Sequence, residues 1–327
     1  MDYPLSIVIP AYDSPALLKR CLESVVAQTH RPLEIVIADD YSPADLTKVV
    51  DDIQFGEGLS VAFHRSNQNL GPYWNMQRAW ALARGRYFLF RPHDDYFIER
   101  DFIRTAVDAL QNRTKATVFV GNSLIEHTDQ TTMSVSPAGT QTFDGTTFIT
   151  RMLWGTTHPA YSAVVIDNER LHEMNYGSFF IEKSELKGLD IEPDELFVGI
   201  VLAALDSEVI VSGTVSSVRG MPSESYSRSE FWQKRGAYGV FLVCWKMIEY
   251  LGLSGRDVER RFFITLITGR YALDWFNYSI LRHLNFSPFV FLLMAHGVLR
   301  RFVIRAKGKI IRTLSLARRF TAASEGK

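Results

Sequence analysis

Short apolar runs alternate with amphipathic stretches along the first third of the chain. The runs are rich in β-branched and aromatic residues and end at polar residues, which is typical of strands. They lie at residues 5–10, 33–39, 59–64, 86–91 and 116–121. In the stretches between them, apolar residues recur every three or four positions, which predicts helices. These helices lie at residues 14–28, 43–52 and 72–84.

This alternation favours an α/β fold with a mostly parallel sheet covered by helices on both faces, because the runs are apolar on both of their sides. Such sheets bind ligands at the carboxyl ends of their strands. Acidic residues follow three of the predicted strands, and they are Asp13, Asp39 with Asp40, and Asp94 with Asp95. The sequence therefore predicts a ligand site at this edge of the sheet.

The pattern loosens after residue 121, and its character changes again near residue 225. Two further strands are predicted, at residues 160–167 and 208–213, with a helix at 194–205. Long helical patterns follow at residues 229–250, 257–281 and 288–320. The expected organisation is an α/β domain over 1–225, with halves at 1–122 and 123–225, and a helical C-terminal region over 226–327.

Composition adds a charged surface to this picture. With 327 residues, 46% of them hydrophobic, the chain can bury a sizeable core, which excludes disorder as its main state. The formal net charge is zero, but residues 300–327 hold nine basic residues and one acid, a charge of +8, which leaves −8 on the rest. Apolar residues recur there at helical spacing, which is typical of a helix on an anionic membrane surface.

We expect this membrane contact over residues 296–320. The alternative is a helix packed on the rest of the protein with its basic face in solvent. Nothing upstream in the sequence supports nucleic acid as the partner of the basic residues.

The cysteines and the apolar stretches bear on location. Cys21 and Cys244 are too few for a disulfide framework or a zinc site, which favours a reducing compartment. The N-terminal apolar run is short and lacks a preceding basic segment, so we expect no signal peptide. The longest apolar stretch, 288–299, is shorter than the ~20 residues that span a bilayer. We expect a cytoplasmic protein, peripheral on the inner face of the membrane, and we leave its oligomeric state open.

Three segments resemble the family 2 glycosyltransferases of the GT-A fold. They are LSIVIPAYDSPALLKRCLESVVAQTHRPLEIVIADDYS at 5–42, the loop and helix RSNQNLGPYWNMQ at 65–77, and PHDDY at 92–96. The resemblance is strong over residues 5–100, moderate to about 220 and absent beyond. It implies a metal-dependent inverting transfer of a sugar from a nucleotide-diphosphate donor. The acceptor would be a hydroxyl of a glycan or a lipid-linked saccharide in cell-surface polysaccharide synthesis.

The donor-binding candidates lie after the first three strands. The segment Pro10, Ala11 and Tyr12 matches the family's Pro-x-Tyr, and the Tyr12 ring offers a flat face to a nucleobase, although it could instead pack on its neighbours. Asp40 can accept a hydrogen bond from a pyrimidine imide or a ribose hydroxyl, which favours UDP or dTDP, or it can cap a helix. We expect the preceding Asp39 to point the other way and to cap the following turn.

Two asparagines are further donor-side candidates. Asn69 lies in an Asn-x-Gly segment, and Asn75 follows it in the predicted helix at 72–84. Both are expected to orient the loop over the donor. The alternative for Asn69 is ordinary turn chemistry, because asparagine before glycine is common in turns.

The metal is predicted at the third acidic cluster. No glycine-rich phosphate loop occurs in the sequence, so a divalent cation would neutralise the diphosphate. Carboxylates at a strand end suit Mg²⁺ or Mn²⁺. The resemblance implies Asp95 as the direct ligand and Asp94 as a contact to the ribose or to a metal-bound water. Pro92 stands where the family commonly has another acid, which favours a single direct ligand. His93 is more often charge-paired than ligating, and the acid pair could instead cap the helix starting near Arg100.

The transfer also needs a base. A carboxylate opposite the leaving group must take the proton of the acceptor hydroxyl. The resemblance places it at the start of a helix, where Asp194 is the candidate and Glu195 the second choice. The alternative for Asp194 is an ordinary acid stabilised by the helix dipole. His158, on the acceptor side, and Arg219, for phosphate contact, are weaker candidates.

Two other functions remain open at the level of the sequence. A sugar nucleotidyltransferase would also use metal and acids, but it should carry a glycine-rich basic loop after the first strand, and PAYDSP is not such a loop. A non-catalytic scaffold that binds sugar nucleotides would keep the fold and lose the base.

Overall fold

The computed structural model describes one part of the chain. The described residues are 3–127, 131–133, 139–153, 159–174, 176 and 195–221. The chain divides into two compact units, Met1–Met247 and Ile248–Lys327, and all described residues belong to the first. The expected helical region, its basic stretch at 296–320 and the boundary near residue 225 lie outside the described residues.

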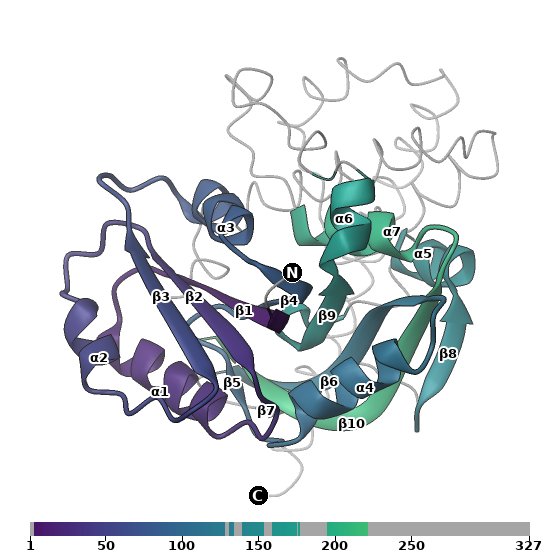
Figure 1. Ribbon diagram of the computed structural model, residues 1–327, viewed down its shortest axis with the longest axis horizontal. Coiled ribbons are helices and arrows are strands. Elements are labelled where there is room, and N and C mark those ends of the chain that lie inside the picture. The colour runs from purple at the N-terminus through teal and green to yellow at the C-terminus, as the bar shows by residue number, and fades with distance from the viewer. Residues whose placement is uncertain are drawn as a thin grey trace, which may run out of the picture. The chain divides into compact units, whose positions relative to one another are not determined.

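Within the described residues, ten strands form one sheet (Figure 1). The main path runs β3-β2-β1-β4-β9-β6-β10-β5, while β7 pairs with β6 and β8 with β10. The strands are β1 (Tyr3–Ala11), β2 (Leu33–Asp39), β3 (Leu59–Arg65), β4 (Gly85–Phe90), β5 (Tyr96–Phe97), β6 (Ala116–His127), β7 (Thr131–Met133), β8 (Gln141–Asp144), β9 (Val164–Asp167) and β10 (Glu208–Met221). Strands β3, β2, β1 and β4 are parallel, β6 and β10 are parallel, and β9 is antiparallel to both β4 and β6.

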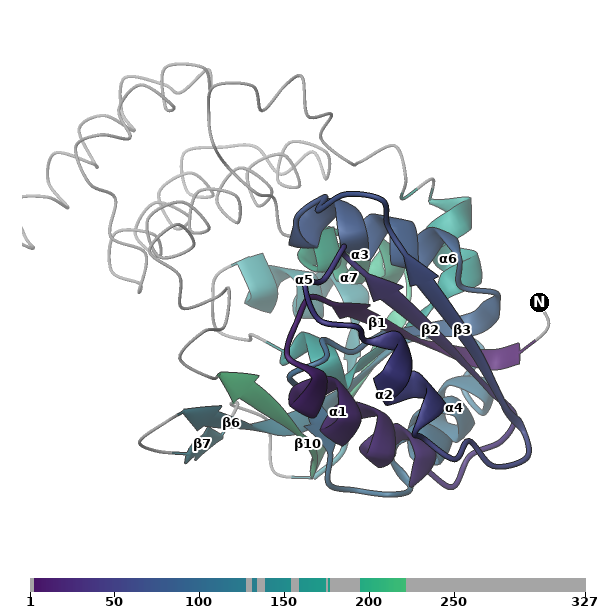
Figure 2. The ribbon, with the colours of Figure 1, turned by 90° about the vertical axis from the view of Figure 1, so that its left-hand side faces the viewer.

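Helices cover both faces of this sheet. They are α1 (Pro15–Val26), α2 (Thr47–Asp51), α3 (Pro72–Ala81), α4 (Phe102–Gln111), α5 (Gly145–Leu153), α6 (Asn168–Glu173) and α7 (Glu195–Ala204), with a 3₁₀ turn at Tyr161–Ala163. Helices α1, α2 and α4 lie on one face, and α3, α6 and α7 lie on the other (Figures 1 and 2). The predicted α/β fold with a mostly parallel sheet is therefore confirmed.

The core between β1 and α1 shows why the chain folds this way. Alternate residues of β1, such as Ile7 and Ile9, are fully buried, and α1 buries Leu18 and Leu22 against the same cluster. A proline at the first position of α1 suits its start, because the missing N–H would have no helical partner. Burying each such side chain stabilises the fold by about 1.5–3 kcal/mol. This packing fixes the carboxyl end of β1, where the candidate site begins.

The register aligns the carboxyl ends of the first strands. Ala11 of β1 pairs with Asp39 of β2, and Asp39 pairs with Arg65 of β3. On the other side of β1, Val8 pairs with Phe90, the last residue of β4. The loops that follow these strands therefore leave from one edge of the sheet, as the sequence predicts.

The expected elements and the observed ones differ mainly after residue 121. The strands at 33–39 and the helix at 72–84 agree closely with β2 and α3, whereas α2 begins later than expected, at Thr47. Strands β6 and β10 extend well beyond their predicted ends, and the segment at 160–167 begins as a 3₁₀ turn before β9. The short strands β5, β7 and β8 and the helices α5 and α6 were not predicted. Among the described residues, no helix has the length and hydrophobicity needed to cross a bilayer.

Candidate functional site

The loops at the sheet edge are bonded to one another. The backbone N–H of Asp40 donates to the Ala11 carbonyl at 2.9 Å, and that of Asp13 donates to the Ser42 hydroxyl at 2.8 Å. Asp13 and Tyr41 adopt positive φ angles, 55° and 62°, which non-glycine residues rarely do. Such backbone strain concentrates at functional sites, where the surrounding structure holds it in place. The edge is therefore a fixed frame.

Asp39 is part of that frame. Its side chain is buried, and its Oδ1 accepts hydrogen bonds from the backbone N–H of Ser42 at 3.0 Å and from the Ser42 hydroxyl. Its Oδ2 accepts from Arg65 Nη1, also at 3.0 Å. The expectation that Asp39 caps the turn is confirmed.

Asp40 is also buried, with 3% of its surface exposed, and it fixes the loop ahead of α3. One carboxylate oxygen accepts the N–H of Leu70 at 2.7 Å, and the other accepts that of Gly71 at 2.9 Å. Burial raises the pKa of Asp40, and these two hydrogen bonds and the charge of Arg78 oppose that rise. Each oxygen keeps a second lone pair, so the nucleoside contact expected for Asp40 remains a prediction.

The other donor-side candidates divide into exposed side chains and a buried one. Tyr12 is 47% exposed at the edge, beside the half-buried Pro10 and the buried Ala11. Asn69 is exposed, and its side-chain oxygen accepts the N–H of Gly71 at 3.0 Å. Tyr12 and Asn69 are thus free to meet a ligand.

Asn75 is the buried one of these side chains. It is buried in α3, its Nδ2 donates to the Ala38 carbonyl at 2.8 Å, and its Oδ1 accepts from Arg78 Nη2 at 3.0 Å. Each end of the amide makes one hydrogen bond within the protein, so Asn75 holds α3 against the end of β2. The expected role of Asn75 on the donor side remains a prediction.

The second acidic pair lies in the turn between β4 and β5. Asp94 is half-buried, while Asp95 is 3% exposed, and its Oδ1 accepts the backbone N–H of Gly220 at 2.8 Å. Strand β10 approaches so closely that a Cβ on Gly220 would lie 2.3 Å from the carbonyl oxygen of Asp94. Only glycine fits this approach. The structure thereby brings Arg219, the residue before Gly220, next to the acid pair, as the electrostatics below also indicate.

The pKa of both acids in this pair is raised. Burial raises the pKa of Asp95 to about 6, and the neighbouring Asp94 carboxylate adds to the rise, while Arg91, a hydrogen bond from the Ser162 side chain and Arg219 oppose it. Burial also raises the pKa of Asp94, against the charges of Arg219 and Arg20. Two desolvated carboxylates at this position favour a cation or a proton.

Arginines surround the pair, and two of them, Arg20 and Arg91, were not predicted. Arg20 Nη2 donates to the Asp94 carbonyl at 3.3 Å, and its guanidinium lies 4.2 Å from the ring centroid of Tyr96. Arg91 is fully buried, with its guanidinium carbon 3.4 Å above the ring centroid of Phe97. No guanidinium nitrogen of Arg91 has a hydrogen-bond partner in the described part of the chain, and burial lowers its pKa to about 10.

Sequence reasoning missed Arg20, Arg91 and Gly220. The strand pattern at 86–91 did place Arg91 inside an apolar run. That position was the available signal, because a buried arginine in a strand needs an explanation. Arg20 and Gly220 gave none, since they approach the acids only through the tertiary fold.

The residues at this edge fit a divalent cation of the magnesium or manganese type. Among the described residues, no group of three or more histidines, cysteines or acids is placed to hold a metal by itself. The pair supplies two carboxylates, a hard oxygen set that leaves positions for phosphate and water, as Mg²⁺ and Mn²⁺ require. Burial lowers the pKa of His93, against the charges of Asp95 and Asp13, which favours a neutral imidazole over the expected charge-paired one.

The candidates for the base cannot be placed. Asp194 and His158 lie outside the described residues, and Glu195 is described only as the first residue of α7. The predicted helix at 194–205 agrees with α7, which ends at Ala204.

Comparison with known proteins gives one family. Residues 6–163 match the model of the family described as Glycosyl transferase family 2. A curated relative, the GalNAc(5)-diNAcBac-PP-undecaprenol beta-1,3-glucosyltransferase of Campylobacter jejuni, is 26% identical over 180 residues, which cover 53% of this chain and 56% of the relative. The chain thus spans little more than half of that relative's length.

Solved structures with the same fold extend the likeness beyond that segment. S. aureus TarS residues 1–349, in complex with UDP-GlcNAc, aligns with a TM-score of 0.55 and 16% identity, covering 83% of this chain and 68% of that one. The mannosyltransferase PcManGT of Pyrobaculum calidifontis, in complex with GDP-Man and Mn²⁺, aligns with a TM-score of 0.52 and 15% identity, covering 94% and 86%. At these identities the likeness shows the GT-A fold alone.

Proposed function

Residues 6–163 belong to glycosyl transferase family 2, and from this premise we propose that the chain is a metal-dependent, inverting glycosyltransferase. It would move a sugar from a nucleotide-diphosphate donor, UDP or dTDP, to a hydroxyl of a glycan or a lipid-linked saccharide in cell-surface polysaccharide synthesis. The Campylobacter relative is named for transfer to a saccharide linked to undecaprenol diphosphate, which is a lipid-linked acceptor. The single observation that carries the proposal is the desolvated pair Asp94 and Asp95 at the carboxyl edge of the sheet.

The donor would lie across this edge. Tyr12, 47% exposed, would stack on the base, and the remaining lone pairs of Asp40 would accept from its imide or from the ribose. Asp95 would hold the divalent cation, with Asp94 contacting the ribose or a metal-bound water. When bound, that cation supplies positive charge that neutralises the diphosphate and favours its departure.

Arginine charge at the same edge would assist. The charge of Arg219 opposes the rise in the pKa of both acids, so the Arg219 guanidinium lies within electrostatic reach of the pair. There it can also contact a donor phosphate, since guanidinium and phosphate form charge-assisted hydrogen bonds. Arg91, buried below, adds a fixed charge that takes no part in binding directly.

The acceptor chemistry is assigned to Asp194, with Glu195 as second choice. The carboxylate takes the proton of the acceptor hydroxyl while that oxygen forms a bond to the anomeric carbon. The bond between the anomeric carbon and the diphosphate oxygen breaks, and the nucleoside diphosphate leaves with its electron pair. Attack from the face opposite the leaving group inverts the anomeric configuration.

The proposed setting is the cytoplasmic face of a membrane. Residues 296–320, with their basic and apolar positions at helical spacing, would contact anionic lipid there. This contact would bring the edge of the sheet to acceptors that are carried on lipids.

The proposal is tested by nucleotide release from a panel of UDP- and dTDP-sugars, with Mn²⁺ and without acceptor. The full chain should bind one donor and hydrolyse it slowly, while Asp194→Ala should keep donor binding and lose release by at least about 100-fold. Thermal shift with each nucleotide measures the binding in parallel. A chain that binds donors but releases no nucleotide would be a scaffold. Equal release with and without Asp194 would exclude Asp194 as the base, and a chain that binds no donor would contradict the proposal altogether.

A further inference from the structure

Arg91, which follows β4, is a buried charge that packing alone does not explain. Its side chain has no exposed surface, and its three guanidinium nitrogens have no hydrogen-bond partner among the described residues. The guanidinium carbon lies 3.4 Å above the centroid of the Phe97 ring. Such a cation–π contact offsets part of the desolvation cost, but it supplies no hydrogen bonds. A leucine or methionine would fill this core position without that cost, so we look for a role of the charge itself.

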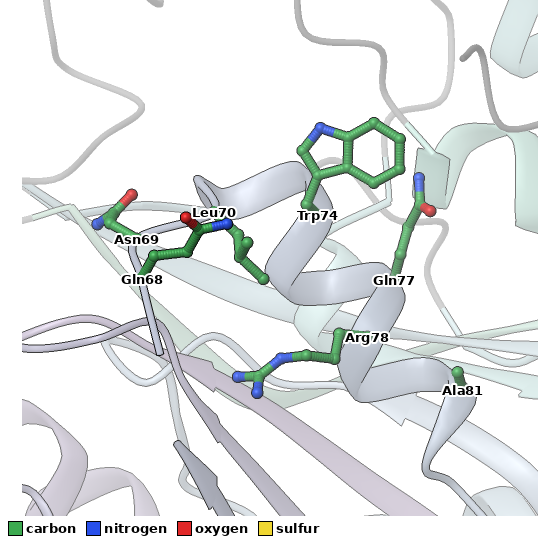
Figure 3. A pocket seen from close by; sticks show the side chains of 7 residues that line it. All are labelled: Gln68, Asn69, Leu70, Trp74, Gln77, Arg78 and Ala81. Atoms are coloured by element: carbon green, nitrogen blue, oxygen red, sulfur yellow. The ribbon is translucent and has the colours of Figure 1, made fainter. Parts of the chain in front are cut away.

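A second arginine near this edge shows how a structural arginine is used. Arg78 is one of the side chains that line the recess beside α3 (Figure 3). Its Nη2 donates to the carbonyl oxygens of Asp39 at 3.0 Å and of His64 at 3.3 Å. Arg78 thereby ties α3 to the ends of β2 and β3. The guanidinium of Arg91 makes no such bond within the described chain, so it contributes mainly its charge.

That charge bears on the acid pair. Phe97, on which the guanidinium lies, is two residues after Asp95. Burial lowers the pKa of Arg91, and the charge of Asp95 opposes that fall, so the two groups are within electrostatic reach of each other. The thiol of Cys21 also faces the guanidinium, but burial raises the pKa of this thiol to about 12. The thiol is therefore neutral at physiological pH and does not balance the positive charge.

Burial distinguishes this charge from those of the neighbouring arginines. The side chain of Arg20 is 40% exposed and pairs with Glu126 at 3.7 Å, and Arg219 is half-buried. Water screens the charges of both. Arg91 acts on Asp95 through protein, where the effective dielectric constant is lower and charges interact more strongly. Because Arg91 is fully enclosed, it cannot touch a ligand, and it can influence one only through its electric field.

We propose that Arg91 is a positioning residue whose buried charge biases the acid pair against a divalent cation on its own and in favour of the nucleotide diphosphate. This charge repels a cation beside Asp95, whereas it attracts an anionic diphosphate at the same edge. The edge thus accepts the cation together with its nucleotide more readily than the cation alone. This inference rests on the proposed function, because it takes the donor to lie across the acid pair.

The test compares full-length Arg91→Met with the wild type in two titrations, one with Mn²⁺ alone and one with UDP alone. Mn²⁺ is followed by electron paramagnetic resonance under nitrogen at pH 8.5, well above the pKa of Asp95, so that protons compete little. UDP is followed by calorimetry. Loss of the charge should strengthen Mn²⁺ binding and weaken UDP binding, each by at least about threefold. A loosened edge would instead weaken both, so the opposite signs identify an effect of charge.

Two further variants separate charge from shape. Arg91→Gln removes the same charge but leaves a polar side chain, so it should change both affinities in the same directions as Arg91→Met. Arg86→Met removes an exposed charge from the other end of β4 and should change neither affinity. Urea unfolding checks that each variant is folded.

Three results would overturn this inference. The first is wild-type affinity for Mn²⁺ and UDP in folded Arg91→Met and Arg91→Gln, and the second is a change of both affinities in the same direction. The third is failure of both variants to fold, which would make Arg91 a packing residue. In each case nucleotide release by the wild type would leave the proposed transfer standing. Wild-type protein that binds neither Mn²⁺ nor UDP would contradict the inference and the proposed function together.

Discussion

Two Asp-Asp pairs lie at the carboxyl edge of the sheet, and they differ in how fully the surrounding protein satisfies their carboxylates. Asp39 and Asp40 are buried, and all four of their oxygens accept hydrogen bonds from backbone or side-chain groups. Asp95 accepts the N–H of Gly220 from strand β10, and a hydrogen bond from the Ser162 side chain lowers its pKa, yet burial and the Asp94 carboxylate still raise that pKa to about 6. The first pair builds the edge, whereas the second contains a carboxyl whose pKa stays near 6 in spite of its partners.

The difference teaches how a carboxylate becomes available for a ligand. Desolvation raises the pKa of Asp40, Asp94 and Asp95 alike. At Asp40 two backbone N–H groups and Arg78 oppose the rise and the charge of Asp39 adds least to it, whereas at Asp95 the Asp94 carboxylate is the largest contribution after burial. A divalent cation would offset the desolvation and mutual repulsion of Asp94 and Asp95. At Asp39 and Asp40 the oxygens already accept hydrogen bonds from the protein, so a cation is not needed there.

The largest expected effect separates the two pairs by stability. Asp39→Ala should lower the free energy of unfolding by about 2–4 kcal/mol, because it strips Arg65 and the Ser42 turn of their acceptor. Asp95→Asn should leave that free energy unchanged or raise it by up to about 3 kcal/mol, since a carboxyl with a pKa near 6 destabilises the folded state at neutral pH. Urea unfolding without metal measures both. A loss of similar size in both variants would show that the pairs are not different in kind.

A smaller effect should follow pH. The folded pKa of Asp95, about 6, is raised above the ordinary value near 3.9, so the folded protein binds this proton before the unfolded chain does. The free energy of unfolding of the wild type should therefore rise, relative to Asp95→Asn, as the pH falls from 7.5 to about 4.5. Divalent cation binding should weaken over the same range. A difference between the two proteins that stays constant with pH would remove the claim that Asp95 is desolvated.

The smallest expected effect lies within the first pair. Ser42→Ala removes the hydroxyl that donates to Asp39 and accepts from the N–H of Asp13. The free energy of unfolding should fall by about 1–2 kcal/mol, as is usual when a buried hydrogen-bond partner is lost. Thermal unfolding against wild type measures it, with Ser60→Ala on the half-buried edge strand β3 as the control. Equal stability of the two variants would mean that the turn after β2 is held by other groups.

Much of the first half of the fold follows from periodicity, and the acceptor-side half does not. The runs that became β1, β2, β3 and β4 are short, apolar and clearly bounded, so burial on both faces was visible in the residues. Strand β5 is two residues long and exists only through its pairing with β10, and the turn that precedes β9 depends on tertiary packing. Such elements carry too few residues for a period to be recognised.

The site divides in the same way. Asp39 as a turn cap follows from strand alternation, and the structure confirms it. The roles of Asn75 and Arg91 depend on which side of a helix or strand faces the core, and a single residue type does not reveal this. Gly220 meets Asp94 from 126 positions along the chain, a separation at which local pattern carries no information.

The most direct test of the central claim is Mn²⁺ binding, followed by the electron paramagnetic resonance signal of free Mn²⁺. Wild-type protein with UDP should bind one Mn²⁺, and binding should be weaker without UDP because the phosphates complete the coordination. Asp95→Asn should weaken binding with UDP by at least about tenfold, while Asp52→Asn, at an exposed acid after α2, should not change it. Equal Mn²⁺ affinity in Asp95→Asn and wild type would contradict the account, because the second pair would then not be the place where the cation binds.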